Sequence, residues 1–218
     1  MTVTPREFHD AAGADWRLVG QTACTHFRTG SLAAGARLAQ AIGALEGIDD
    51  FHPAVDVRRD GVTVRVFTFL SDPGRLSTRH TELAGRISAV ARELGAPADP
   101  SVVQNLVVSI DALVIADVLP FWRAVLGYLP RADTPDEELY DPHLRWPVFY
   151  FNQMDAPRPL RNRIHLDVWV PHDQAEARVA AALAAGGHLV TDRHAPAWWV
   201  LADAEGNEAC VASRTDLD

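Results

Sequence analysis

The sequence lacks the features that would place it outside a cell or across a membrane. It has two cysteines, Cys24 and Cys210, and neither has a second cysteine nearby to form a CxxC motif. Both are expected to be reduced, buried thiols, which excludes a disulfide scaffold. No stretch reaches the ~18 apolar residues that would span a bilayer, and residues 1–16 lack the basic start and apolar run of a signal peptide. We expect a cytoplasmic protein.

The chain is also poor in positive charge. Lysine and arginine together number 20 against 29 acidic residues, which gives a formal net charge of −9. Nucleic acids and anionic membranes would need clustered basic side chains, so neither is expected as a partner. Low-complexity tracts and charge blocks are absent as well, which predicts that the whole chain is folded.

Length and composition favour two domains. The chain has 218 residues with 48% hydrophobic and 22% charged side chains, which is ordinary globular composition. A single core usually belongs to roughly 100–150 residues. The segment 96–100 contains two prolines and follows a helical pattern that stops at Gly95. We therefore predict one domain over residues 1–98 and a second over residues 101–218.

The first half predicts a small α+β domain with helices on one face of an antiparallel sheet. Apolar residues recur at helical spacing after Ser31 and again after Ser77, and both serines are suited to cap a helix. Residues 55–58 and 62–67 alternate apolar and polar side chains around Asp60-Gly61, which predicts a β-hairpin. A further strand pair is expected between Trp16 and Arg28.

The second half repeats one order of elements. A strand, a helix and further strands occur twice, about sixty residues apart, which predicts two βαβββ modules. Neither module alone could bury its sheet. The expected strands are 106–110, 148–152, 163–170, 188–191, 198–202 and 208–212, and the expected helices are a run ending at Tyr128 and residues 173–185.

Alternation along the strands identifies a candidate ligand-binding face, because successive side chains point to opposite sides of a sheet. The aliphatic residues of one strand should face the helices, namely Ile164, Leu166, Val168 and Val170. The residues between them, three polar and one aromatic, then point to the opposite face. Tyr150 shares a face with Asn152, and Glu208 shares one with Cys210. A polar face with an aromatic wall suits a small polar ligand. The strand 163–170 contributes Arg163, His165, Asp167 and Trp169 to it.

A metal site is one interpretation of this face. If the strands curl toward each other, His165 and Glu208 converge with Asn152, and an imidazole with a carboxylate can hold a divalent ion such as zinc, nickel, iron or manganese. A fourth position would come from Asn105 or Ser109. The alternative is that a histidine beside an aspartate is a hydrogen-bonded structural residue. Residues 203–207 are expected to form a β-turn.

Motifs in this half resemble the vicinal-oxygen-chelate superfamily, in its glyoxalase-like branch found in actinobacterial proteins. The resemblance covers about Gln104 to Ser213 and rests on PFWRAVLGY, RNRIHLDVWVP and WVLADAEGNEACV. It implies paired βαβββ modules around a U-shaped cleft whose metal ligands come from four strands. His165 and Glu208 match two of those places, and Asn152 stands where members often carry Gln. The first-strand ligand, commonly His, has no His counterpart before Asp111.

The first half resembles pterin-4a-carbinolamine dehydratase from about Trp16 to Gly95. The matching motifs are Asp50-Phe51-His52-Pro53, Thr68-Phe69 and Leu76-Ser77-Thr78-Arg79-His80. In that family, imidazoles exchange protons with the carbinolamine hydroxyl. Here Phe51 and Phe69 replace two of the histidines, and His80 stands where an aspartate is expected. His52 keeps its place, and we expect this domain to lack dehydratase activity.

These observations favour a small-molecule enzyme of lyase or isomerase type that works in the C-terminal cleft. His165 and Glu208 would each act as ligand or base, Arg163 as an anion anchor and Asn152 as a polar contact. A non-catalytic binding or resistance protein is the alternative, and a pterin dehydratase that uses His52 is the third. The hairpin around residues 62–67 offers an unpaired edge, so a homodimer or a dimer of dimers is expected.

Overall fold

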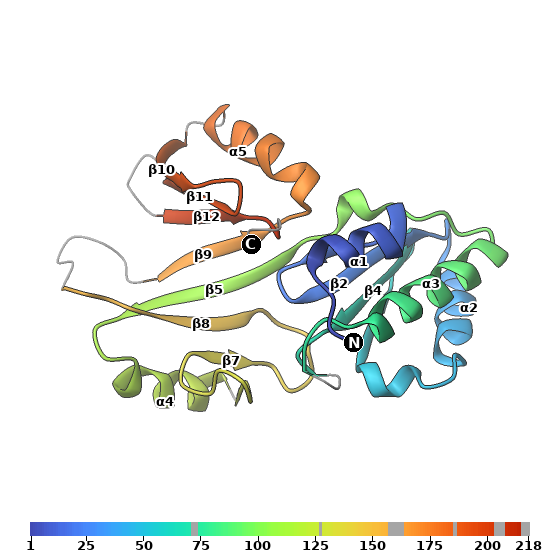
Figure 1. The fold of residues 1–218 in the computed structure, drawn as a ribbon, viewed down its shortest axis with the longest axis horizontal. Coiled ribbons are helices and arrows are strands. Elements are labelled where there is room, and N and C mark those ends of the chain that lie inside the picture. Colours follow the sequence, from blue (N-terminus) through green and yellow to red (C-terminus); the bar gives the residue numbers. More distant parts are fainter. Residues whose placement is uncertain (71–73, 127, 157–163, 185–186, 203–207, 215–218) are drawn as a thin grey trace. The chain divides into compact units, whose positions relative to one another are not determined.

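The chain divides into two compact units, Met1–Gln104 and Asn105–Ser213. The predicted linker lies within the first unit, because Ala98 forms a β-bridge with Phe27 and the Arg28 amide donates to the Pro97 carbonyl at 2.9 Å. The prolines of this segment end a helix, but the backbone of the segment stays hydrogen-bonded to the sheet. The computed structural model (Figure 1) describes residues 1–70, 74–126, 128–156, 164–184, 187–202 and 208–214.

The first unit is a four-stranded antiparallel sheet with three α-helices, as the sequence predicts for its strands and two of its helices. The order of strands in the sheet is β1-β2-β4-β3. The first helix was not predicted, although Thr4 and Glu7 form a capping box at its start. The elements are α1 (Pro5–Ala12), η1 (Gly13–Asp15), β1 (Arg17–Val19), β2 (Thr22–Arg28), α2 (Leu32–Gly43), η2 (Ile48–Phe51), β3 (Pro53–Val57), β4 (Gly61–Phe67), α3 (Thr78–Glu93) and η3 (Pro100–Val102).

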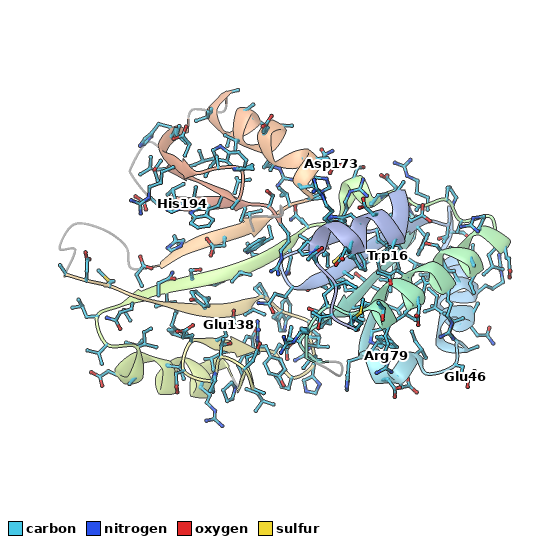
Figure 2. All side chains as sticks on the ribbon, in the orientation of Figure 1. Trp16, Glu46, Arg79, Glu138, Asp173 and His194 are labelled. Atoms are coloured by element: carbon cyan, nitrogen blue, oxygen red, sulfur yellow. The ribbon has the colours of Figure 1, made fainter. Side chains whose placement is uncertain are left out.

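The core of this unit lies between the helices and one face of the sheet. Ser31 caps α2 by accepting the Ala34 amide at 3.2 Å, which starts a helix whose apolar side faces the sheet. Trp16 is fully buried, and its indole N–H donates to Ser88 at 3.1 Å (Figure 2). The main contributors are Phe8, Trp16, Phe27, Leu38, Ile42, Val62, Val64, Leu83 and Ile87.

The predicted edge of this sheet is wrong. Strand β4 pairs with β2 on one side and with β3 on the other, so residues 62–67 lie inside the sheet. The alternating pattern of a strand shows which side chains are buried, but it does not show how many neighbours the backbone has. The outer strand of the hairpin is β3, and the expected dimer would have to use that edge or another surface.

The second unit contains one sheet of eight described strands and two α-helices. Its order is β10-β11-β12-β9-β5-β8-β7-β6, with α5 beside β10 to β12 and α4 beside β8 (Figure 1). The elements are β5 (Asn105–Ala112), α4 (Ile115–Leu126), β6 (Leu129–Pro130), β7 (Glu138–Tyr140), β8 (Val148–Gln153), β9 (Ile164–Trp169), η4 (His172–Gln174), α5 (Ala175–Ala184), β10 (His188–His194), β11 (Trp198–Ala202) and β12 (Glu208–Ala212).

The predicted order of strand, helix and strands occurs twice, beginning at β5 and at β9. The two modules meet where β5 and β9 pair antiparallel, and within each module the first strand pairs parallel with the last. The short strands β6 and β7 were not predicted. In the described part of the chain, no helix has the length and apolar character needed to cross a membrane.

The predicted division of β9 into an aliphatic and a polar face holds in part. Val170 is fully buried and Val168 packs against the same apolar cluster, which includes Val179 of α5. Leu166 is 42% exposed, so the expectation that it faces a helix is wrong.

Candidate functional site

Strand register brings the polar residues of four neighbouring strands, β12, β9, β5 and β8, to one face of the sheet. Ser109 of β5 lies opposite Tyr150 of β8 on one side and opposite His165 of β9 on the other. Directly paired residues point to the same face of a sheet. The parallel pairing of β12 with β9 matches Cys210 with Asp167, and Glu208, two residues before Cys210 in the same strand, shares its face. This face of the sheet carries the candidate site.

The His165 imidazole lies between two carboxylates. Its Nδ1 is 3.8 Å from Asp111 Oδ2, and its Nε2 is 3.5 Å from Asp167 Oδ1. All three side chains are between 16% and 21% exposed, so they are shielded from bulk water yet reachable by a small ligand. The two ring nitrogens therefore face different acidic partners.

Asp167 is fixed by neighbours other than His165. Ser109, which is fully buried, donates its hydroxyl hydrogen to Asp167 Oδ2 at 2.5 Å. Burial by itself raises the pKa of Asp167, but hydrogen bonds from His165 and Ser109 outweigh it and hold that pKa below its usual range. The Asp167 side chain is therefore an ionised carboxylate at neutral pH.

Asp111 is a site residue that the sequence interpretation missed. The predicted strand ended at Ile110, whereas β5 continues to Ala112 and places Asp111 on the same face as Ser109. Asn152, opposite Asp111 in register, donates its amide hydrogen to Asp111 Oδ1 at 3.1 Å. Alternation from Asn105 would have found Asp111, had the strand been extended by one residue.

Cys210 completes a group that can hold a metal ion. Donor atoms of His165, Asp167 and Cys210 all lie within 4.8 Å of one another. Burial, followed by the charge of Asp167, raises the pKa of the Cys210 thiol. An imidazole, a carboxylate and a thiol form a donor set that fits a divalent ion. Among the described residues, this group does not include Glu208, which the sequence predicts as the second ligand.

The other predicted site residues lie around this centre or outside the described residues. Tyr150 donates its hydroxyl hydrogen to Glu137 at 3.4 Å, and Glu138, the first residue of β7 (Figure 2), lies opposite Tyr150. Trp169 is half-buried at the far end of β9. The predicted anion anchor Arg163 and the predicted turn 203–207 lie outside the described residues.

A cavity of about 540 Å³ lies away from the polar row, beside α5. Its walls are apolar apart from one carboxylate, so it lacks the converging polar groups that orient a substrate. We therefore do not assign the chemistry to it. The lining residues are Glu176, Val179, Ala180, Leu183, Ala195, Pro196 and Trp199.

In the first unit, the dehydratase-like positions do not form a comparable cluster. His52 is exposed and has left-handed backbone angles, with φ at 45°. His80 is 2% exposed and accepts the Ser77 amide at Nδ1, while its ring meets the Phe51 ring edge-on at 5.4 Å. His80 thus caps α3. A catalytic role for His52 stays a prediction.

Comparison with known proteins assigns the second unit to a class. Residues 107–212 match the family model of the glyoxalase-like domain. A glyoxalase/bleomycin resistance protein/dioxygenase superfamily member from Vibrio splendidus 12B01 is 15% identical and covers 51% of this chain and 100% of its own, with a TM-score of 0.35. A search of curated proteins gives no match.

Residues 107–212 therefore form a glyoxalase-like domain, and the predicted resemblance of the second half is confirmed at this level. The match begins in β5 and ends in β12, so it spans both modules and every residue of the polar row that we describe. The resemblance of the first half to pterin dehydratases stays a prediction.

Proposed function

We propose that the second unit is a small-molecule enzyme of lyase or isomerase type that works on the polar face of β5, β8, β9 and β12. The observation that carries this proposal is the position of His165 between Asp111 and Asp167. An imidazole held by a carboxylate on one nitrogen is a common general acid and base, because the carboxylate orients the ring and stabilises its charged form.

Reactions of this type commonly start with removal of a proton from the carbon next to a carbonyl group. In the proposed reaction His165 accepts this proton at the ring nitrogen that does not donate to Asp167, or His165 binds a metal ion and Glu208 accepts the proton. One divalent ion, of zinc, nickel, iron or manganese, would polarise the substrate carbonyl. Asn152, Tyr150 and Trp169 would contact the substrate, and Arg163 would anchor an anionic group.

Solvent hydrogen exchange tests this proposal without knowledge of the natural substrate. Small hydroxy- and keto-carbonyl compounds are incubated with the protein in heavy water, and NMR records loss of the signal from the hydrogen next to the carbonyl. We expect the wild-type protein to accelerate exchange for at least one compound, and His165→Ala to lower that rate roughly 100-fold or more.

The control variant is His188→Ala, which removes an exposed imidazole at the start of β10 and should keep the wild-type rate. Equal rates in wild type and His165→Ala would count against His165 as the base. An absence of exchange for every compound would favour the second candidate.

That second candidate is a non-catalytic binding or resistance protein. It is favoured by Ser109, which occupies the first strand of the site and donates its hydroxyl hydrogen to Asp167. A serine hydroxyl engaged in this way adds neither a strong metal ligand nor a base. Native mass spectrometry separates the two candidates: a co-purified small molecule that binds one per chain and is recovered unchanged identifies a binding protein.

We also propose a homodimer, or a dimer of dimers, organised by the first unit in the cytoplasm. The outer strand β3 offers a backbone edge, and twofold pairing is a common way to satisfy such an edge. Light scattering is expected to give at least twice the chain mass of 23.8 kDa. A Val55→Pro variant, which blocks strand pairing on β3, should shift the distribution toward the monomer, and a monomeric wild-type protein would rule this assembly out.

A further inference from the structure

We propose that the cavity beside α5 is a second ligand site, which binds a small molecule with an apolar body and one cationic group, such as a protonated amine. The cavity and the polar row lie on opposite faces of the sheet. Trp199, which lines the cavity, pairs with Val211, and Val211 is next to Cys210 of the polar row in β12. This inference goes beyond the proposed function and does not depend on it.

The cavity has a buried floor and an exposed rim. Val179 and Trp199 form the floor, and they are 8% and 9% exposed. The volume of about 540 Å³ lies within the range of roughly 300–1,000 Å³ that small-molecule pockets occupy. A ligand can therefore enter from solvent and reach buried apolar side chains. The rim consists of Glu176, Ala180, Leu183, Ala195 and Pro196.

Small side chains on α5 leave this space unfilled. The helix contributes Glu176, Val179, Ala180 and Leu183, whose spacing of three, one and three residues places them on one side of the helix. Most of α5 is alanine, with the sequence AEARVAAALA. A methyl group at position 180 does not reach the opposite wall, so the gap is a consequence of the sequence.

The opposite wall is held in place by hydrogen bonds. Ser213, which is 3% exposed, donates its hydroxyl hydrogen to the Pro196 carbonyl at 2.7 Å, and its amide donates to the Ala197 carbonyl at 2.8 Å. The Ala197 amide donates in turn to the His194 carbonyl at 2.9 Å. Because this wall is fixed before a ligand arrives, binding has a low conformational cost.

The lining residues select the chemistry of the ligand. The apolar floor favours an apolar body, and the indole of Trp199 also attracts cations. Among the described residues that line the cavity, Glu176 carries the charge, and its carboxylate attracts a cation and repels an anion. Glu176 is exposed on the rim, so a cationic group beside it stays in contact with water and avoids the cost of burial.

The two parts of the ligand contribute differently. An ion pair between exposed groups is worth little, typically about 0.2–1 kcal/mol. Burial of the apolar body on Val179 and Trp199 therefore supplies most of the affinity, and Glu176 supplies the preference for positive charge.

Three probes that share a naphthalene ring and differ in charge test this site. The full chain, labelled with nitrogen-15, is titrated at pH 7 with 1-naphthylmethylamine, which is a cation, with neutral 1-naphthalenemethanol and with anionic 1-naphthoate. We expect the amide signals of α5 and of residues 197–199 to shift. The amine should bind about 2- to 5-fold more tightly than the alcohol, and the carboxylate should bind more weakly than either.

Two exposed positions on α5 separate the cavity from the rest of the helix surface. Ala180→Phe places a ring where the naphthalene would lie, and it should weaken binding of all three probes roughly 10-fold or more, since their apolar burial is lost. Ala181→Phe adds the same ring at the next residue, which is exposed and does not line the cavity. This control should bind the probes as the wild type does.

Two carboxylates separate a local effect of charge from a general one. Glu176→Gln should remove the preference for the amine, so that the amine and the alcohol bind alike. Asp117→Asn removes an exposed carboxylate from α4 instead and should leave the preference unchanged. His165→Ala should also keep the wild-type affinities, because His165 lies on the other face of the sheet.

Shifts confined to the polar row, or equal affinities in wild type and Ala180→Phe, would overturn the site. A preference for the amine that persists in Glu176→Gln would overturn the assignment of a cationic ligand. Light scattering tests the other possible occupant: if Ala180→Phe lowers the mass of the assembly and Ala181→Phe does not, a second copy of the chain covers the cavity and the proposal is wrong.

Discussion

Gly61→Ala is expected to destabilise the first unit by about 3 kcal/mol or more. The added Cβ atom would overlap a backbone atom, and moving a single side chain cannot remove such an overlap. A Cβ atom at this position would lie 2.4 Å from the Phe27 carbonyl oxygen and 2.4 Å from His26 Nε2. The His26 ring can move, but the carbonyl belongs to β2, which pairs with β4 at this point. In the variant, either the hydrogen bonds between β2 and β4 break at this end of the two strands, or the two strands shift relative to each other.

Gly85→Ala is the matched control, with an effect of opposite sign. Gly85 is exposed inside α3, and a Cβ there would meet nothing within 4 Å. Alanine should stabilise the helix by about 1 kcal/mol. Urea unfolding followed by circular dichroism, with hydrogen exchange of the β2 and β4 amides to locate the change, measures both variants. Equal stability of Gly61→Ala and wild type would show that the contact is relieved at no cost.

His80→Gln is expected to remove a pH-dependent part of the stability of the first unit. His80 Nδ1 accepts the Ser77 amide at 3.1 Å, which requires an unprotonated nitrogen. Burial lowers the pKa of His80, and the charge of Arg79, itself paired with Asp50, adds to this effect. Glutamine also accepts the amide, in the usual capping box, but it does not titrate.

The sign follows from the lowered pKa. In the unfolded chain the imidazole titrates near pH 6.5. Above that pH, the contribution of His80 to the free energy of unfolding is therefore fully present. It is lost as the pH falls below about 6.5, by up to about 1.4 kcal/mol per pH unit until the folded pKa is reached. His80→Gln should therefore lose less stability than wild type between pH 7 and pH 5 in thermal unfolding.

The exposed His52 provides the control for that comparison. His52→Asn keeps a residue type that tolerates left-handed backbone angles, and its stability should vary with pH as the wild type's does. If His80→Gln and wild type instead lose equal stability on acidification, the buried imidazole does not control the cap of α3.

Local patterns were sufficient where a short segment carries its own signal. Ser31 and Ser77 start helices where the sequence places them, since a capping hydroxyl acts within one helical turn. The β3–β4 hairpin was predicted around Asp60-Gly61, but the reason for Gly61 was missed. Its backbone is not left-handed, and the close approach of Phe27 and His26 is what excludes a side chain.

The candidate site was predicted one strand at a time. Alternation correctly put His165 and Asp167 on one face and Asn152 on a polar face, because side-chain direction in a strand depends on local geometry. It could not show that Asp111 is the residue beside the His165 ring, or that Cys210 is the residue beside Asp167. Those neighbours follow from the register of β5 and β12 against β9, which residues far apart in the sequence decide.

By itself, the sequence determined the repeated strand–helix–strands order of the second unit and the resemblance of residues 107–212 to a glyoxalase-like domain. These features depend on contacts within a few residues or on motifs at fixed spacing. Only the tertiary structure decided that β4 is an inner strand, that residues 96–99 are bound to β2, and that His165 meets Asp111, Asp167 and Cys210. Each of these depends on which strands become neighbours, and that outcome is set by burial of the whole sheet, which no single segment encodes.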